Sequence, residues 1–214
     1  MEKIGFHKVV PEIFSQRTDI VSDIWNKDVV FEKGRSYLIE AGSGKGKSTF
    51  CSYVLGCRRD YSGQITFDGT VSSSFKVADW VDMRKNRLSY MFQELRLFPE
   101  LTAYENVEIK NKLTGCKTRR QIEDWFDMLG IGDKLDAKVG HMSFGQQQRV
   151  AMMRALAQPF DFILADEPVS HLDDANSVVM GRLMATEAEA RGAGVIVTSI
   201  GKHMDLGYEK TLRL

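Results

Sequence analysis

Ala41-Gly42-Ser43-Gly44-Lys45-Gly46-Lys47-Ser48-Thr49 directly follows the apolar run Tyr37-Leu38-Ile39. This is the order of a buried strand that runs into a glycine-rich loop. Glycines let backbone N–H groups point into a small concave space, where several of them together can surround a chain of phosphates. Residues 41–49 therefore predict an α/β domain that binds a nucleoside triphosphate.

Three side chains at the end of this loop have the chemistry that a triphosphate and its metal ion require. Lys47 is expected to reach the β- and γ-phosphates as a point charge. The Ser48 hydroxyl is expected to complete the coordination shell of Mg²⁺, and Thr49 to contact the α-phosphate. Residues 50–55 then read as a helix that Gly56 ends, with the positive end of its dipole beneath the phosphates.

The loop departs at one position from the phosphate-binding pattern G-x-x-x-x-G-K-[ST]. Ala41 stands where that pattern has its first glycine. Alanine is tolerated if this residue keeps a negative φ, and Gly42 beside it can absorb part of the strain. The alternative interpretation is a surface loop rich in Gly, Ser and Lys. The strand before the loop and the helix after it favour the phosphate loop.

The composition is that of an ordinary globular protein. The chain has 214 residues, of which 43% are apolar and 27% charged, and its formal net charge is zero. This suits one α/β domain and gives no reason to expect nucleic acid as a partner. The three cysteines lack metal-ligand spacing and predict reduced thiols in a cytoplasmic protein. With neither a signal peptide nor a membrane-spanning run visible, contact with a membrane is expected to run through a docking partner.

Strand and helix patterns alternate at both ends of the chain, with a helical stretch between them at 103–158. Glu32-Lys33-Gly34-Arg35 predicts a hairpin turn between two early strands, and Ser143 is predicted to be the N-cap of a helix. The expected fold is therefore a parallel sheet interrupted by a helical insertion. The predicted strands are 5–10, 29–31, 37–40, 65–67, 88–93, 160–165 and 194–199, and the best-defined helices are 120–129 and 176–191.

Two adjacent carboxylates close the apolar run at residues 162–165. Ligands of open α/β sheets bind at the carboxyl ends of the strands. Asp166 is therefore expected to hold Mg²⁺, partly through water, and Glu167 to act as general base on the water that attacks the γ-phosphate. The alternative is a purely structural Asp-Glu-Pro turn that ends at Pro168, which the phosphate loop upstream disfavours.

Residues 142–151 read Met142-Ser143-Phe144-Gly145-Gln146-Gln147-Gln148-Arg149-Val150-Ala151 and resemble the signature sequence of ABC ATPases. Gln93 resembles the Gln-loop residue of that family, and residues 170–173 resemble its D-loop. The motifs follow the family's order over nearly the whole chain. Residues 97–107 look most similar to the small ATPases of the lipoprotein-release, macrolide-export and cell-division group.

The resemblance implies a P-loop NTPase fold with a mostly parallel core sheet, an N-terminal antiparallel β part and an inserted α-helical subdomain. A single domain is expected over 1–214, with its nucleotide-binding core at approximately 1–98 and 159–214 and the helical subdomain at approximately 99–158. The helical subdomain is expected to contact transmembrane transporter subunits at the cytoplasmic face of the membrane.

The resemblance also implies a head-to-tail homodimer with two ATP molecules held between the subunits. In such a dimer Ser143, Gly145 and Gln146 of one subunit face the phosphate loop of the other. Gln93 is expected to sense Mg²⁺ and the attacking water. An aromatic residue near the N-terminus stacks on adenine in this family, and Phe14 is the candidate, although a place in the core suits it equally.

Two further positions differ from the family. Phe144 stands where the signature usually has glycine, and Ser199 stands where the family has its switch histidine. A serine hydroxyl can donate a hydrogen bond, but it carries no charge and reaches less far than an imidazole. The expected function is an ATP-hydrolysing subunit that powers a transporter or related membrane complex through dimer closure. The alternative is an ATP-binding interaction or regulatory module with weak or no hydrolysis, because position 199 is serine.

Overall fold

Two β-sheets organise the computed structural model, which describes residues 1–17, 21–42 and 44–214. The first sheet is antiparallel, with its strands in the order β2-β1-β4-β5, and the second is parallel, in the order β6-β7-β8-β3-β9. The antiparallel strands are β1 (Lys3–Pro11), β2 (Asp28–Glu32), β4 (Tyr61–Phe67) and β5 (Thr70–Val71). The parallel strands are β3 (Ser36–Glu40), β6 (Leu88–Met91), β7 (Phe162–Asp166), β8 (Gly194–Ser199) and β9 (Lys210–Arg213).

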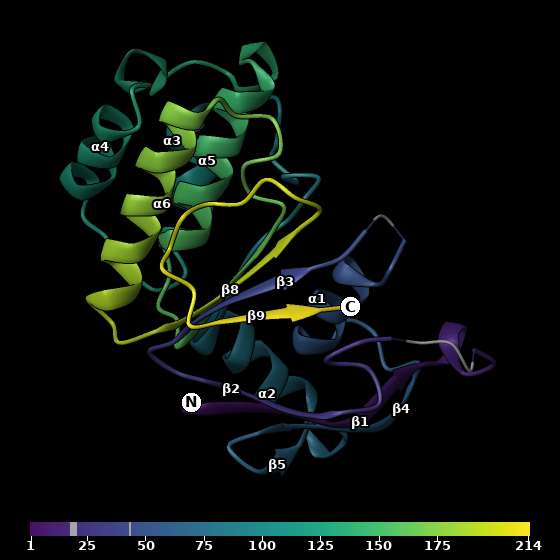
Figure 1. Cartoon of the computed structure of the whole chain (residues 1–214). Coiled ribbons are helices and arrows are strands. Elements are labelled where there is room, and N and C mark those ends of the chain that lie inside the picture. Colours follow the sequence, from purple (N-terminus) through teal and green to yellow (C-terminus); the bar gives the residue numbers. More distant parts are fainter. Residues whose placement is uncertain (18–20, 43) are drawn as a thin grey trace.

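The parallel sheet has a hydrophobic core on each of its faces. Helices α3 to α6 gather on one side of it, whereas α1 and the antiparallel sheet lie on the other (Figure 1). Neighbouring residues along a strand alternate between the two cores, as Ile163 and Leu164 do in β7. Strands covered on both faces read as continuous apolar runs, which is why β7 and β8 were predictable from the sequence. The predicted α/β fold class is confirmed.

The predicted hairpin at residues 32–35 is wrong. β2 and β3 belong to different sheets and do not pair, so the turn carries the chain from the antiparallel sheet to the parallel one. The two strands differ in pattern: Val30 is exposed between buried neighbours in β2, whereas Tyr37, Leu38 and Ile39 are all buried in β3. A strand buried on both faces needs a parallel, covered position rather than a hairpin partner.

Several predicted helix and strand boundaries shift by a few residues. The helix after the phosphate loop begins at Lys47, three residues earlier than expected, and the strand expected over 88–93 ends at Met91. Ser143 is the N-cap of α5, since its hydroxyl accepts a hydrogen bond from the Gln146 amide. The helices are α1 (Lys47–Val54), α2 (Val77–Asp82), α3 (Ala103–Asn111), α4 (Arg119–Met128), α5 (Phe144–Leu156) and α6 (Asp174–Glu189).

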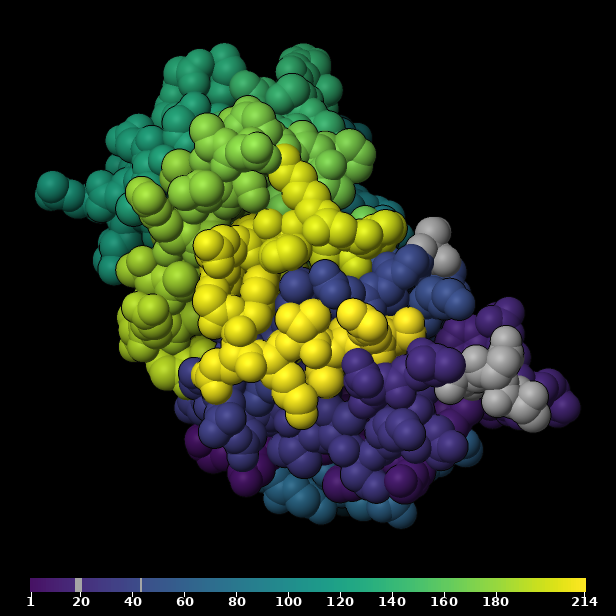
Figure 2. Space-filling view, in the orientation of Figure 1, coloured from purple at the N-terminus to yellow at the C-terminus, as the bar shows by residue number. Residues whose placement is uncertain are grey.

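The C-terminal segment completes the parallel sheet. β9 was not predicted; it is a four-residue edge strand that pairs with β3. Figure 2 shows this segment, in yellow, lying across one face of the molecule between the helical part and the N-terminal part. None of the helices in the described part of the chain has the length and apolarity that a membrane crossing needs.

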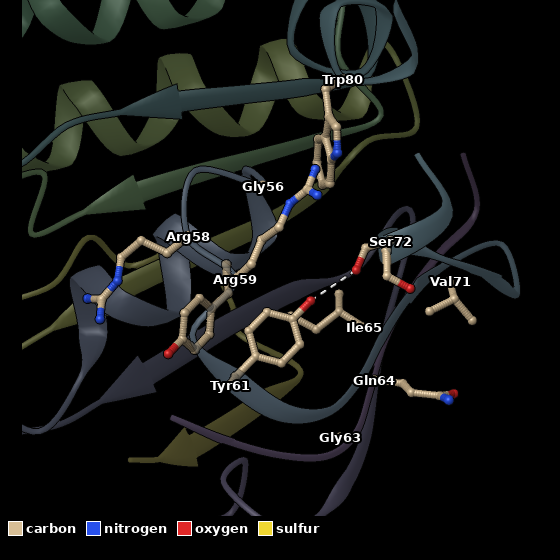
Figure 3. Close-up of a pocket in the computed structure, with 12 residues that line it drawn as sticks. Gly56, Arg58, Arg59, Tyr61, Gly63, Gln64, Ile65, Val71, Ser72 and Trp80 are labelled. Atoms are coloured by element: carbon tan, nitrogen blue, oxygen red, sulfur yellow. Dashed lines mark hydrogen bonds between the residues drawn. The ribbon is translucent and has the colours of Figure 1, made fainter. Parts of the chain in front are cut away.

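A hollow of about 270 Å³ opens beside the loop that follows α1 (Figure 3). The Tyr61 hydroxyl lies 3.0 Å from the Ser72 hydroxyl across it, and the Trp80 ring forms one wall. Gly56 has φ +66°, and a Cβ added there would lie 2.4 Å from the Trp80 ring. The predicted helix stop at Gly56 is therefore also the place where Trp80 packs against the chain.

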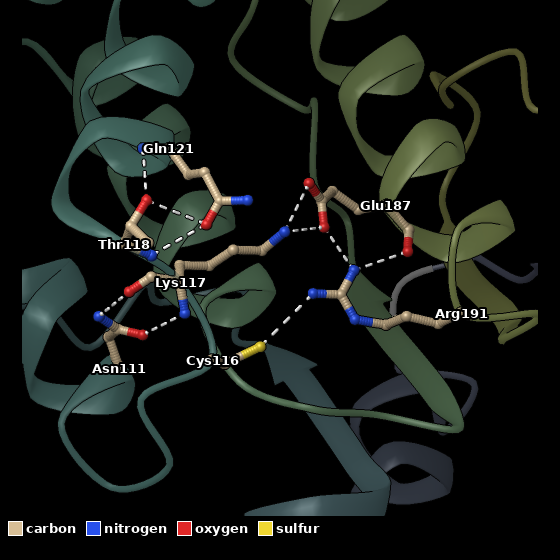
Figure 4. Close-up of polar contacts among 7 residues, drawn as sticks. All are labelled: Asn111, Cys116, Lys117, Thr118, Gln121, Glu187 and Arg191. Carbon is tan, nitrogen blue, oxygen red and sulfur yellow. Dashed lines mark hydrogen bonds and ion pairs between the residues drawn. The ribbon is translucent and has the colours of Figure 1, made fainter.

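A partly buried group of charges connects the loop before α4 to the end of α6 (Figure 4). The Lys117 ammonium lies 2.8 Å from the Glu187 carboxylate and 5.0 Å from the centre of the Trp125 ring. Arg191 donates to the same carboxylate and also lies 3.6 Å from the Cys116 sulfur. Burial raises the pKa of Glu187, but the hydrogen bonds and charges of Lys117 and Arg191 outweigh it and hold the pKa below its usual value.

A Glu187→Gln variant is expected to lower the free energy of unfolding by about 3 kcal/mol at pH 7, since it leaves two partly buried cations without their anion. The stabilisation from a carboxyl with a lowered folded pKa is complete above its unfolded value of about 4.3 and is lost as the pH falls through the folded value. Urea melts at pH 7, 5 and 3 should show the difference from wild type shrink at pH 3. The exposed Glu189→Gln is the control, and an equal loss in both variants would contradict the role of this cluster.

Candidate functional site

The glycine-rich loop connects the end of β3 to the start of α1. Gly44 and Gly46 have φ values of +74° and +102°, a region that favours glycine. The space beside Gly44 is open, whereas Gly46 lies directly over the rings of Phe14 and Trp25, 3.3 Å from the position of an added Cβ. The loop therefore packs against two aromatic rings at Gly46, whereas Gly44 faces open space. The predicted binding residue Ser43 lies outside the described residues.

The Lys47 side chain folds back into the loop. Its ammonium donates to the carbonyl oxygens of Ala41 and Gly42, at 3.0 and 3.3 Å, and lies 3.4 Å from Oε1 of Glu167. The side chain is only 6% exposed. A positive charge is therefore held inside the loop, where it faces the carboxylate at the end of β7.

Asp166 ends β7 as a buried carboxylate with three hydroxyl donors. Ser48 donates to its Oδ2 at 2.8 Å and Tyr90 to the same oxygen at 3.1 Å, while Thr198 donates to Oδ1. The residue is 1% exposed. A carboxylate beside a hydroxyl at the end of a phosphate-type loop is a donor set that suits a hard divalent cation.

Glu167 follows Asp166 in a left-handed backbone conformation with φ +50°. Its amide donates to the Thr198 carbonyl at 3.1 Å, which holds this turn against β8. Non-glycine residues in this region cost about 1 kcal/mol or more and cluster at functional sites. Here the conformation places the carboxylate beside Lys47, and its role as general base stays a prediction.

A single pocket of about 340 Å³ brings Lys47, Ser48 and Glu167 together with residues that lie far away in the sequence. Gln93, which follows β6 by two residues, lies in its wall together with Glu167 and the phosphate loop. The remaining lining residues are Ile13, Phe14, Gly44, Gly46, Lys47, Ser48, Thr49 and Ile200. Backbone donors, an enclosed cation and a hydroxyl beside a carboxylate are the groups that a polyphosphate and its metal ion need. The residues present fit such a ligand.

Ser199 does not line this pocket. It is fully buried, and its hydroxyl donates to the Lys202 carbonyl at 2.8 Å and accepts from the Gly201 amide at 2.9 Å. The hydroxyl would have to give up its bond to the Lys202 carbonyl before it could donate to a phosphate, so its catalytic role stays a prediction. Ile200 lines the pocket instead, whereas His203 lies against Tyr208.

Phe14 lies in the pocket wall but is mostly buried. Phe14 is 8% exposed and its ring packs against Gly46. The Arg17 guanidinium lies over this ring, 5.3 Å from its centre. The neighbouring Ile13 is 72% exposed in the same wall. Stacking of Phe14 on an adenine therefore stays a prediction.

The signature residues lie at the N-terminus of α5, not in the pocket wall. Phe144 is 44% exposed and packs edge-on against the His171 ring, with centroids 4.5 Å apart. Gly145 lies against Leu172, where an added Cβ would come within 3.0 Å of the side chain. The signature helix and residues 170–173 therefore form one packed surface within the subunit.

Sequence reasoning missed Tyr90 and Thr198 as partners of Asp166. Tyr90 lies on β6 and Thr198 on β8, the two strands that flank β7, and Thr198 is opposite Asp166 in the β7–β8 register. A hydroxyl residue near the end of each flanking strand was the available signal. It could be used only once the strand order was known.

The chain resembles known proteins over most of its length. Residues 26–170 match the family described as "ABC transporter". A macrolide export ATP-binding/permease protein MacB from Shewanella sp. (strain ANA-3) is 33% identical over 88% of this chain, but the match spans only 29% of that relative. An uncharacterized ABC transporter ATP-binding protein from Thermotoga maritima is 35% identical over 83% of this chain and 77% of its own.

Solved structures agree with this match. The dimeric structure of MJ0796, a bacterial ABC transporter cassette, has a TM-score of 0.78 with 26% identity and covers 92% of this chain and 88% of its own. A second dimeric structure of the MJ0796 ATP-binding cassette, in a post-hydrolysis state with ADP and Pi, has a TM-score of 0.76.

Proposed function

Because the chain belongs to the ABC transporter family, we propose that it is an ATP-binding and ATP-hydrolysing subunit that powers a membrane transport complex. One observation carries the proposal: a single pocket joins the phosphate loop, Gln93 and Glu167, and its lining residue Ser48 is hydrogen-bonded to the buried Asp166. The ADP and Pi in the MJ0796 post-hydrolysis structure support hydrolysis as the reaction.

The proposed roles follow from the contacts. Loop amides and Lys47 bind the phosphates of ATP, while Ser48 and Asp166 hold Mg²⁺ and Gln93 orients the attacking water. Mg²⁺ neutralises charge on the phosphates when it is bound. Lys47 now lies beside Glu167, 3.4 Å away. The phosphates of bound ATP compete with Glu167 for the Lys47 ammonium. Once Lys47 has moved to a phosphate, the Glu167 carboxylate can accept a proton from the attacking water.

We further propose that two copies assemble head to tail around the nucleotides. Ser143, Gly145 and Gln146 lie at the N-terminus of α5, where the amides of Ser143 and Gln146 are paired within the capping box. The positive end of this helix suits a phosphate of the partner's nucleotide. These three residues contribute nothing to the pocket of their own subunit. The dimeric MJ0796 structures support this assembly.

The transmembrane partner is proposed to dock beside the helical subdomain, which we place at approximately 99–158. A mostly apolar groove of about 250 Å³ lies there, with Phe92 and Tyr90 in its wall. Phe98 and Ile109 line the same groove and are 50% and 38% exposed. A helix of a transmembrane subunit suits this groove and would hold the chain at the cytoplasmic face of the membrane.

The rival function is an ATP-binding module without turnover, and the buried hydroxyl of Ser199 is the observation that favours it. Phosphate release from ATP by the purified chain separates the two. We expect turnover that requires Mg²⁺ and disappears in EDTA. Tight ATP binding with release no faster than in the absence of protein would support the rival and contradict hydrolysis.

A further inference from the structure

The Asp166 carboxylate is held by hydroxyl groups from three different elements. Ser48 is the first residue after Lys47 in α1, Thr198 lies on β8, and Tyr90 lies on β6. Thr198 binds one carboxylate oxygen, whereas Ser48 and Tyr90 share the other. Donors on both oxygens fix the plane of a carboxylate, and an ionised carboxylate of this kind can accept all three bonds.

The three donors differ in what a metal ion demands of them. Ser48 is the hydroxyl that would turn its oxygen to Mg²⁺, so its geometry must change on loading. Thr198 and Tyr90 are not expected to bind Mg²⁺ themselves, so they can keep their hydrogen bonds to the carboxylate. Of these two, only Tyr90 reaches the oxygen that Ser48 also contacts, from 3.1 Å.

The surroundings of Tyr90 hold its ring in place. The ring packs edge-on against Phe92 with centroids 4.4 Å apart, and both rings line the apolar groove. The hydroxyl at the far end of the Tyr90 side chain donates to Asp166. A ring fixed in this way keeps the hydroxyl directed at the carboxylate.

We propose that Tyr90 is a positioning residue of the magnesium site: its hydroxyl orients the Asp166 carboxylate for Mg²⁺ bound with ATP. The inference rests on the proposed ATP-binding function. It assigns part of the Mg²⁺ affinity to a residue of β6. The same residue lines the proposed docking groove, so the groove and the magnesium site share Tyr90. Partners that orient a metal-binding group typically contribute 10- to 100-fold in metal affinity.

The test compares Tyr90→Phe with the wild-type full chain, because phenylalanine keeps the ring and removes only the hydroxyl. Calorimetry with a non-hydrolysable ATP analogue is run in excess Mg²⁺ and again in EDTA. The affinity in EDTA should stay within about two-fold of wild type, while the gain in affinity from Mg²⁺ should fall by about 10-fold. Tyr104→Phe is the matched control, since it removes a phenol that donates to Glu108 on α3, and it should change neither value.

Two results would overturn the proposal. One is an unchanged Mg²⁺ gain in Tyr90→Phe. The other is an equal loss of affinity in EDTA and in Mg²⁺ together with a lowered melting temperature, which would make the hydroxyl merely structural. A wild-type chain that binds no analogue under either condition contradicts the proposed function itself and is thereby distinguished from both.

Discussion

A Lys47→Ala variant is expected to bind ATP about 100-fold more weakly than the wild type in the presence of Mg²⁺. Lys47 supplies the enclosed positive charge of the phosphate loop, and its side chain is 6% exposed. Hydrogen bonds from a charged group contribute about 1.5 to 3 kcal/mol each, and a loss of about 2.7 kcal/mol is a 100-fold change in affinity. Equilibrium titration of a fluorescent ATP analogue measures the effect.

The same substitution should leave the fold intact. In the absence of nucleotide, the Lys47 ammonium makes polar contacts only with the carbonyl oxygens of Ala41 and Gly42 and the Glu167 carboxylate among the described residues. The circular dichroism spectrum should therefore stay that of the wild type, while the melting temperature falls because the mostly buried Glu167 loses its cation. Lys27→Ala removes an exposed lysine that does not line the pocket and should bind ATP normally. Normal affinity in Lys47→Ala would refute the assignment of residues 41–49 as the phosphate loop.

The parts of the site that were predictable from sequence are those whose chemistry lies in adjacent residues. Lys47 and Ser48 follow a glycine-rich loop, and Asp166 and Glu167 end an apolar strand, so each pair shows its pattern within ten residues. The contact between the two pairs follows from a general rule, that ligands bind at the carboxyl ends of parallel strands.

The parts that were missed depend on strand order or on the path of a loop. Tyr90 and Thr198 meet Asp166 only because β6 and β8 flank β7. The turn at residues 32–35 reads as a hairpin by its residues alone, because turn chemistry does not say to which sheet the next strand belongs. Similarly, whether the Ser199 hydroxyl faces a ligand is decided by the Gly201 amide and the Lys202 carbonyl, which compete for it locally.

Glu167→Gln is expected to lose turnover by about 100-fold or more, since a general base typically contributes 10²- to 10⁴-fold. Glutamine keeps the size of the side chain but cannot accept the proton of the attacking water. Phosphate release measures the loss, with Glu189→Gln on the exposed face of α6 as the control. Turnover at the wild-type rate would show that Glu167 is not the base.

Nucleotide binding by Glu167→Gln should be retained or become tighter, and this sets it apart from Lys47→Ala. In the wild type, Lys47 must leave the Glu167 carboxylate, 3.4 Å away, before it can serve a phosphate. An amide at position 167 removes that competing anion. ATP should then be held without hydrolysis, and sedimentation velocity with ATP should show a lasting dimer where the wild type returns to monomer. Since the Ser199 hydroxyl is bonded within its own loop, no group there is placed to replace the lost carboxylate.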